Sequence, residues 1–347
     1  IAGTLLHTLQ GHTELVRGVA ALTLPDGTPL LLSGSNDKTV RVWTLPENVR
    51  QALNVAARAK EEELNNECSF FFVDAAFLRA HDPATPLPVF QELRKLGVLR
   101  EVVVRFRDVV RGVHCTDTLI VSHRWEEKGM PDPQGVQLRV IKEELDARPE
   151  IVRVWIDWCC MPQGERSGPD KAEFKRMLPR INMLYLGCSV LLIVDNTYAT
   201  RFWTQFEAWL AMRKCTASGL GPAKEGEERF VLRCIHLAKD KYQGMQLRDM
   251  WQEATADQAY EILSSPDVMV TNQSDKEIQL TKLKPLNQKV QGAFAEMARE
   301  VAGLRAEAER LEAEASRLRA DADVIEAMAA GLTKPSTKEP QAASGSI

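Results

Sequence analysis

The chain has 347 residues, of which 44% are hydrophobic and 27% charged, and its formal net charge is −4. This length suggests two or three domains, one of them able to bury a sizeable core. The weak negative charge disfavours a basic surface for nucleic acid or anionic lipid, and no apolar run approaches the roughly 18 residues that a membrane helix needs.

Cysteine usage favours a reducing compartment. There are seven cysteines, an odd number, none of them forms a C-x-x-C pair, and most stand beside apolar residues. Buried free thiols are the better interpretation, so we expect a cytoplasmic protein. Adjacent residues such as Cys159-Cys160 rarely chelate one ion, so we predict no metal site. Because the chain begins with Ile1 and shows no signal-peptide pattern, we expect a piece of a longer protein.

Residues 1–48 have the pattern of short strands joined by turns. Pro25-Asp-Gly27 is a turn signal, and Thr39-Val-Arg-Val-Trp43 alternates as a half-buried strand does. Together with the Gly11-His12 pair, this segment resembles one blade of a WD-repeat propeller. The resemblance implies a hydrogen-bonded structural tetrad of His12, Ser33, Asp37 and Trp43. One blade cannot bury its faces alone, so it is either part of a truncated propeller, which would dock protein partners, or a degenerate leftover.

Residues 49–115 are interpreted as a helical connector. Val49–Glu67 has the composition of an exposed helix, and Val89–Leu96 and Leu99–Val113 are helical by spacing. Val102-Val-Val could instead be a strand. We assign no function to this region.

Residues 116–282 alternate between strands and helices. Strands interleaved with helices favour an α/β domain with a parallel, doubly wound sheet and right-handed crossovers. A Pro179 kink is expected inside one of the helices. The five predicted strands are Thr118–Ser122, Ile151–Ile156, Ser189–Val194, Phe230–Ile235 and Asp267–Val270, and the helices between them are Gln137–Ala147, Ala172–Leu186, Phe202–Arg213 and Met250–Leu263.

Residues 283–332 carry a heptad pattern. Such a pattern predicts a coiled coil through which the chain forms a homo-oligomer, the alternative being a helix packed on its own domain. Glu307 and Glu314 flank the seam on one side, and Arg305 and Arg319 on the other. Residues 333–347 are predicted to be a disordered tail. Two rows form the seam: Leu283, Val290, Met297, Leu304, Leu311, Leu318, Ile325 and Leu332 in one, and Phe294, Val301, Ala308, Ala315 and Ala322 in the other.

Three polar loops follow the first three strands of the α/β domain, at Ser122–Glu127, Asp157–Glu165 and Asp195–Trp203. In a parallel sheet they converge at the carboxyl edge, where open α/β sheets bind their ligands. Trp203 and Glu207 are four residues apart and therefore share one face of the helix that follows. The edge would gather aromatic, acidic and basic side chains: Trp125, Trp158, Trp203, Glu126, Asp157, Glu207, His123, Arg124 and Arg201.

These loops resemble the motifs of the Toll/interleukin-receptor (TIR) domain family. Val121-Ser-His-Arg-Trp-Glu-Glu127 is similar to its first-strand motif, and Trp155-Ile-Asp157 to the end of its second strand. Asn196–Glu207 is similar to its third box, in which Asn-Tyr-Ala precedes a Trp and then a Glu. The resemblance implies a flavodoxin-like, parallel five-stranded sheet in residues 116–282.

The resemblance also implies two functions. Some members of the family are non-enzymatic signalling modules, whereas others release nicotinamide from NAD+ with the Glu of the third box. In the enzymatic case Glu207 would be catalytic, stabilising an oxocarbenium-like centre as nicotinamide leaves, with NAD+ as substrate and no cofactor. The alternative is a protein–protein interaction module or scaffold. Substrate-binding candidates are Ser122, Arg124, Trp125, Asp157 and Trp203.

Overall fold

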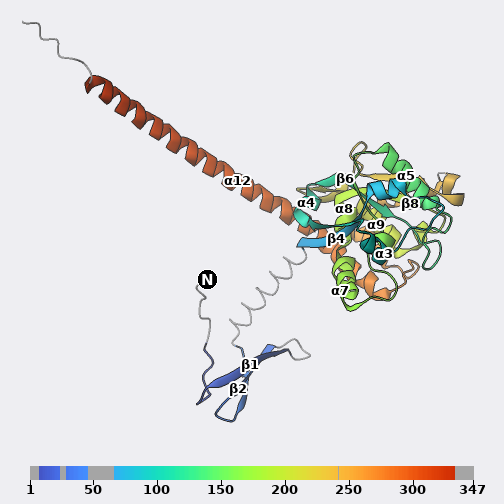
Figure 1. Cartoon of the computed structure of the whole chain (residues 1–347), viewed down its shortest axis with the longest axis horizontal. Helices are drawn as coiled ribbons and strands as arrows, with labels where there is room; N and C mark the ends of the chain where they lie inside the picture. The colour runs from blue at the N-terminus through green and yellow to red at the C-terminus, as the bar shows by residue number, and fades with distance from the viewer. Residues whose placement is uncertain (1–7, 24–28, 46–65, 241, 333–347) are drawn as a thin grey trace, which may run out of the picture.

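The computed structural model describes residues 8–23, 29–45, 66–240 and 242–332 (Figure 1). Strands β1 (Val16–Thr23), β2 (Pro29–Ser35) and β3 (Val40–Thr44) form one antiparallel sheet in the order β1-β2-β3. Most of the predicted helix at Val49–Glu67 and the predicted tail from Thr333 lie outside the described residues.

A second sheet has six strands in the order β11-β8-β6-β7-β4-β5. Four of them run parallel, and β4 and β5 run antiparallel to their neighbours. The strands are β4 (Glu67–Asp74), β5 (Leu99–Arg105), β6 (His114–Ser122), β7 (Arg153–Trp155), β8 (Cys188–Val194) and β11 (Phe230–Cys234).

The sheet corrects two predictions. We expected five parallel strands, and the sheet is six-stranded and mixed. The predicted strand Asp267–Val270 forms an isolated bridge between Arg201 and Met269 instead. The helical connector is wrong over β4 and β5, whose antiparallel pairs extend the sheet beyond β7. The cause is the apolar run Phe70–Val73, buried along its whole length, because periodicity alone does not separate a short buried strand from a helix.

Helices pack over both sides of the central strands. Every residue of β8 is buried, as is the second half of β6, which is typical of parallel strands covered on both faces. Helix α2 (Ala75–Ala80) packs against α5 (Val136–Ala147), and α8 (Asn182–Gly187) packs against α9 (Phe202–Ala211). Both α5 and α9 contact β8.

Two predicted helices are interrupted. The expected kink at Pro179 is a break, where α7 (Gly168–Met177) gives way to the 3₁₀ turn η1 (Leu178–Arg180) before α8. Met250–Leu263 divides into the end of α10 (Tyr242–Trp251) and α11 (Ala256–Ser264) because Thr255 starts a new helix with a capping box. The remaining elements are α3 (Phe90–Leu96), α4 (Phe106–Val110), α6 (Asp157–Cys160), η2 (Tyr198–Thr200), η3 (His236–Asp240) and the hairpin β9 (Arg213–Thr216) and β10 (Gly219–Pro222).

Helix α12 (Gln273–Leu332) is 60 residues long and extends far beyond the α/β domain (Figure 1). Its first turns belong to the core, where Leu283 and Val290 are buried and the helix contacts α4, α11 and the β9–β10 hairpin. The predicted boundary at 283 is therefore too early, because the first seam positions pack on the chain's own domain. Farther along the helix, the large apolar seam residues Val301, Leu304, Leu311, Leu318 and Ile325 are exposed.

Candidate functional site

The loops after β6, β7 and β8 lie at one edge of the sheet. These three strands are parallel, with Ile120 level with both Trp155 and Val190, so their carboxyl ends point the same way. The site predicted from the sequence is therefore assembled from one edge, and two polar clusters lie there.

The inner cluster centres on Glu207, from α9. Ser122, the last residue of β6, donates a hydrogen bond of 2.6 Å from Oγ to Glu207 Oε2, and its Oγ lies 2.6 Å from the hydroxyl of Tyr198. Ser122, Tyr198 and Glu207 are all buried, and Glu207 is 8% exposed. The carboxyl group is thus enclosed by hydroxyl groups rather than facing solvent.

Burial changes the protonation of this carboxyl. Removal from water raises the pKa of Glu207 to about 8, against the opposing effect of the Ser122 hydrogen bond. The charge of Asp157 raises it further, whereas a hydrogen bond from Tyr185 and the charge of His123 lower it. Near neutral pH the Glu207 carboxyl is therefore mostly neutral, and it becomes a carboxylate only in mildly alkaline solution.

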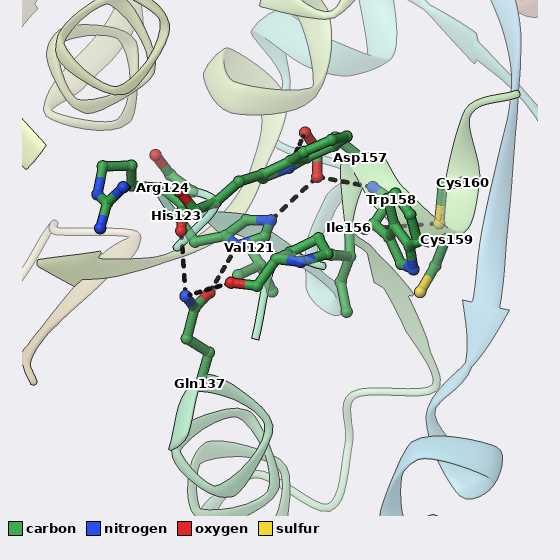
Figure 2. Close-up of polar contacts among 12 residues, drawn as sticks. Val121, His123, Arg124, Gln137, Ile156, Asp157, Trp158, Cys159 and Cys160 are labelled. Atoms are coloured by element: carbon green, nitrogen blue, oxygen red, sulfur yellow. Dashed lines mark hydrogen bonds and ion pairs between the residues drawn. The ribbon is translucent and has the colours of Figure 1, made fainter. Parts of the chain in front are cut away.

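The outer cluster is built around His123. The ring bridges two elements, with Nδ1 2.6 Å from Gln137 Oε1 and Nε2 3.0 Å from Asp157 Oδ1 (Figure 2). Trp125 donates from Nε1 to Asp157 Oδ2 at 2.9 Å, and its ring meets that of Trp158 edge to face, 5.1 Å between centroids. Asp157 thus joins the loops after β6 and β7.

Opposing effects act on the pKa of His123. Burial lowers its pKa, but the hydrogen bond and charge of Asp157 outweigh burial and raise it. Gln137 is also buried, and its Nε2 donates to the carbonyl groups of Arg124 and Pro131 at 3.0 and 3.1 Å. One glutamine side chain therefore fixes both the imidazole and the loop that follows β6.

Ion pairs close the remainder of the edge. Arg124 Nε donates to Asp195 Oδ2 at 2.6 Å, which links the ends of β6 and β8. His236 Nε2 lies 2.8 Å from Glu126 Oε1, which links the first loop to the segment after β11. The Arg124 guanidinium is thus committed to a carboxylate of the protein itself.

One cavity lies beside the outer cluster. It has a volume of about 110 Å³, and His123, Gln137, Trp158 and Pro131 are among the residues that line it. This is smaller than the roughly 300 Å³ at which small-molecule pockets begin. Glu207 is not among the residues that line this cavity, and its side chain is buried among the hydroxyl groups of the inner cluster.

Two predicted side chains point elsewhere. Trp203 is half-buried, and its ring contacts are with Phe202 and Phe206, at 5.5 and 6.1 Å between centroids. Arg201 is exposed, and its main chain bridges to Met269. Spacing of four residues on α9 therefore did not bring the Trp203 indole to the carboxyl of Glu207.

Sequence reasoning passed over Gln137, Tyr185 and Tyr198 as members of the site. Tyr198 stood inside the third box and could have been identified from that motif. Gln137 lies two residues after Gly135. The φ angle of Gly135 is +63°, and a Cβ atom at this position would clash with the main chain of Pro83. A glycine before a helix rich in apolar residues is a weak signal, and nothing in the sequence connects Gln137 with His123.

In the three-stranded sheet, four side chains lie in one hydrogen-bonded chain. His12 Nδ1 is 2.8 Å from Asp37 Oδ2, His12 Nε2 is 2.7 Å from Ser33 Oγ, and Trp43 Nε1 donates to Ser33 Oγ at 2.7 Å. A hydrogen bond from the Thr39 hydroxyl is the largest cause that holds the pKa of Asp37 well below its usual range. The geometry matches the structural tetrad that the WD-repeat resemblance implies.

All seven cysteines are free thiols, and burial raises the pKa of Cys160 to about 12, which keeps it protonated and unreactive. Within the described ranges, no group of three or more His, Cys, Asp or Glu side chains is arranged to hold a metal ion. None of the helices described is long and apolar enough to cross a membrane.

Comparison with known proteins identifies one part of the chain. The model of the WD domain, G-beta repeat family matches residues 3–44, so this segment is a WD repeat. No curated protein matches the chain, and no solved structure matches it either.

Proposed function

We propose that the chain is a self-associating protein-interaction module, in which the WD repeat docks a protein partner and helix α12 joins copies of the chain. The single observation that carries the proposal is the exposed apolar seam on the outer half of α12. In that half, Leu304 is 71%, Leu311 50%, Leu318 62% and Ile325 66% exposed. These residues recur every seven positions, which is the spacing of a coiled-coil seam.

The seam gains stability by pairing. Full burial of a leucine or isoleucine side chain contributes about 1.5–3 kcal/mol, and these side chains are half to two-thirds exposed before association. A pair of helices would therefore gain about 1–1.5 kcal/mol at each such side chain. Several such positions on each helix are enough to offset the entropy lost on association.

Charges beside the seam favour parallel helices. Residues that precede the alanine row are acidic throughout the outer half, so an antiparallel pair would set acid against acid. In a parallel pair, Glu314 of one helix faces Arg319 of the other, an attractive contact, although Glu307 faces Glu312. The acidic positions are Glu300, Glu307, Glu314 and Asp321.

Cysteine cross-linking tests both association and direction. In a parallel, in-register pair, Ala308→Cys places the two thiols at the seam, where mild oxidation joins them. Ser316→Cys is the matched control, because it lies one helical position outside the seam and is exposed. Cross-linking of both variants alike, or of neither, at concentrations where light scattering reports a dimer would contradict the parallel seam.

A substitution in the seam measures how much one leucine contributes to the free energy of association. Leu311→Ala removes about 2–3 kcal/mol from a two-helix assembly, which raises the dissociation constant roughly 30- to 150-fold. Glu309→Ala changes an exposed residue next to the seam residue Ala308. It should change the dissociation constant by no more than about twofold. Sedimentation equilibrium of the three proteins measures the difference.

The WD repeat supports a protein partner for the other end of the chain. Its three strands leave Val19 77%, Val40 72% and Val42 60% exposed. A WD repeat buries such surfaces against neighbouring repeats, and propellers bind proteins. We therefore assign this segment to a propeller completed by further repeats, and its test is whether residues 8–45 resist proteolysis only when such repeats are supplied.

A second candidate function, NAD+ hydrolysis, is supported by the order of the parallel strands. The order β7-β6-β8-β11 corresponds to second, first, third and fourth strands, which is the order of a flavodoxin-like sheet, and ligands bind where that order reverses. The reversal lies between β6 and β8, at the loops that hold Ser122 and Asp195. Glu207 is hydrogen-bonded to Ser122 at this point.

The enzymatic candidate requires the inner cluster to open. Glu207 is buried, and its raised pKa keeps it neutral near pH 7, whereas stabilisation of an oxocarbenium-like centre needs a carboxylate. Incubation of the assembled protein with NAD+ and measurement of free nicotinamide tests it. Turnover that is lost in Glu207→Ala and retained in Glu309→Ala supports NAD+ hydrolysis. Absence of turnover from pH 7 to pH 9 rejects NAD+ hydrolysis and favours the interaction module.

A further inference from the structure

A large cleft lies at the edge of the sheet opposite the candidate site. Its volume is about 970 Å³, near the upper limit of the roughly 300–1,000 Å³ that small-molecule pockets occupy. It opens at the beginnings of three neighbouring strands, where Cys115 of β6, Ser189 of β8 and Phe230 of β11 line it. The cleft therefore shares no residue with the clusters around Glu207 and His123.

The lining is strongly basic. Five cationic side chains line the cleft, against the two carboxylates Glu227 and Glu228. This excess stands out in a chain whose net charge is −4. The five cations are Arg111, Arg148, Arg213, Lys214 and Arg229.

Two of the arginines that line the cleft hydrogen-bond to main-chain carbonyl groups and to no carboxylate. Arg229 donates to the carbonyl oxygens of Cys188 and Leu210, both at 2.6 Å. Arg213 is 2% exposed and donates to the carbonyl oxygens of Ala254 and Trp251, and its Nε is buried with no partner. Although burial lowers the pKa of Arg213 to about 10, both groups stay charged at neutral pH.

The carboxylates in the cleft do not neutralise these groups. Glu227 pairs with Lys214 at 2.6 Å, and Glu228 accepts from the main-chain N–H of Gly226 at 2.8 Å and lies 3.5 Å from Arg248. The positive charges of Arg213 and Arg229 therefore add to the attraction of the cleft for an anion.

One wall of the cleft is apolar. Val109, Val110, Leu186 and Phe294 line it, and Phe294 comes from the part of α12 that packs on the domain. A cleft with a multiply charged basic end and a flat aromatic surface suits a ligand that combines phosphate groups with a planar ring. Arginine is the side chain best suited to bidentate contacts with phosphate.

We infer that this cleft binds the polyphosphate group of a nucleotide, with the base against the apolar wall that includes Phe294. The positive charges that line the cleft would hold the phosphate groups, and affinity would fall as salt concentration rises.

Calorimetric titration with ATP, inorganic tripolyphosphate and adenosine tests the inference. ATP and tripolyphosphate should bind and adenosine should not. Lys214→Gln and Arg111→Gln should each weaken ATP binding about three- to tenfold. Glu227→Gln should tighten it by a similar factor, because it removes a negative charge and releases Lys214. Arg105→Gln, on the far strand β5, is the matched control and should bind ATP as the parent does.

Phe294→Ala separates the two parts of the ligand. It should weaken ATP binding at least threefold and leave tripolyphosphate binding unchanged, which a general loss of folding would not do. Absence of ATP and tripolyphosphate binding at millimolar concentration overturns the inference. The inference is also overturned if Lys214→Gln and Glu227→Gln bind ATP as Arg105→Gln does. If Phe294→Ala weakens the binding of ATP and of tripolyphosphate equally, the assignment of the base to the apolar wall is wrong.

Discussion

Replacement of Glu207 by glutamine removes one ionisable group from the middle of the α/β domain while keeping its shape. The amide oxygen of Gln can still accept the hydrogen bond that Ser122 Oγ now gives to Glu207 at 2.6 Å. The two proteins therefore differ mainly in whether position 207 can lose a proton. We expect Glu207→Gln to be the more stable protein at pH 8 and the two to be nearly equal at pH 4.5.

The size of the effect follows from the raised pKa. In the unfolded chain the carboxyl titrates near its ordinary value of 4.5, and in the folded protein burial raises the pKa to about 8. Between these values the folded state holds a proton that the unfolded state has lost, so stability falls as pH rises, by about 1.4 kcal/mol for each pH unit. The loss reaches at most about 5 kcal/mol near pH 8 and then stays constant.

Urea unfolding followed by tryptophan fluorescence measures the difference. Six of the seven tryptophans of the chain lie in the α/β domain, so the signal reports on the unfolding of that domain. His123, whose pKa is also raised, contributes stability below pH 6.5 that is lost as pH rises through its folded pKa. Because both proteins contain His123, the difference between them isolates position 207.

The control is Glu309→Gln, an exposed carboxyl on α12, for which the pH dependence should follow that of the parent protein. If Glu207→Gln loses stability with pH as steeply as the parent between pH 5 and 8, the carboxyl is not protonated in the folded state. In that case Glu207 would be a buried carboxylate stabilised by its hydroxyl partners, and the conclusion that the inner cluster is neutral would be wrong.

Three further predictions concern the parts that hold the fold. Arg79→Ala removes a side chain whose Nη2 donates to three carbonyl oxygens near the end of α5 and should lower the free energy of unfolding by about 2–3 kcal/mol in the same urea assay. Gly135→Ala should cost at least about 2 kcal/mol, because φ is +63° and a Cβ would meet the Pro83 carbonyl oxygen at 1.8 Å. Ser33→Ala removes the hydroxyl that joins His12 and Trp43 and should speed proteolysis within the WD repeat, whereas Ser316→Ala should not.

The sequence predicted the parallel part of the domain well because its signals are local. Thr118–Ser122, Ser189–Val194 and Phe230–Ile235 are continuous apolar runs bounded by turns, and the structure places β6, β8 and β11 there. Strand β4 was missed because its place in the sheet depends on pairing with β7, far along the chain. Strand β5 confirms the alternative of a strand at Val102-Val-Val. A short apolar run such as Phe70–Val73 has no period that could identify it as a strand.

The site was predicted in outline and missed in its geometry. Parallel strands guarantee that the loops after β6, β7 and β8 share one edge, so Ser122, His123 and Asp157 were brought together by topology alone. Which way a side chain faces depends on tertiary packing. Glu207 faces inward to Ser122, and Trp203 packs on its neighbouring rings.

The protonation of Glu207 decides between the two candidate functions of the domain. A neutral carboxyl that shares hydrogen bonds with Ser122 stabilises a closed edge, which suits a domain that acts by contact with other proteins. Hydrolysis would need Glu207 ionised and facing a ligand. With its pKa raised to about 8, ionisation of the buried carboxyl costs about 1.4 kcal/mol at pH 7, and the contacts that bury the side chain must open as well. This opening must be offset by another interaction, and association through the exposed seam of α12 is the one we propose. An enzyme would therefore show turnover that rises with protein concentration and is lost in Leu311→Ala. Turnover independent of concentration would contradict this coupling.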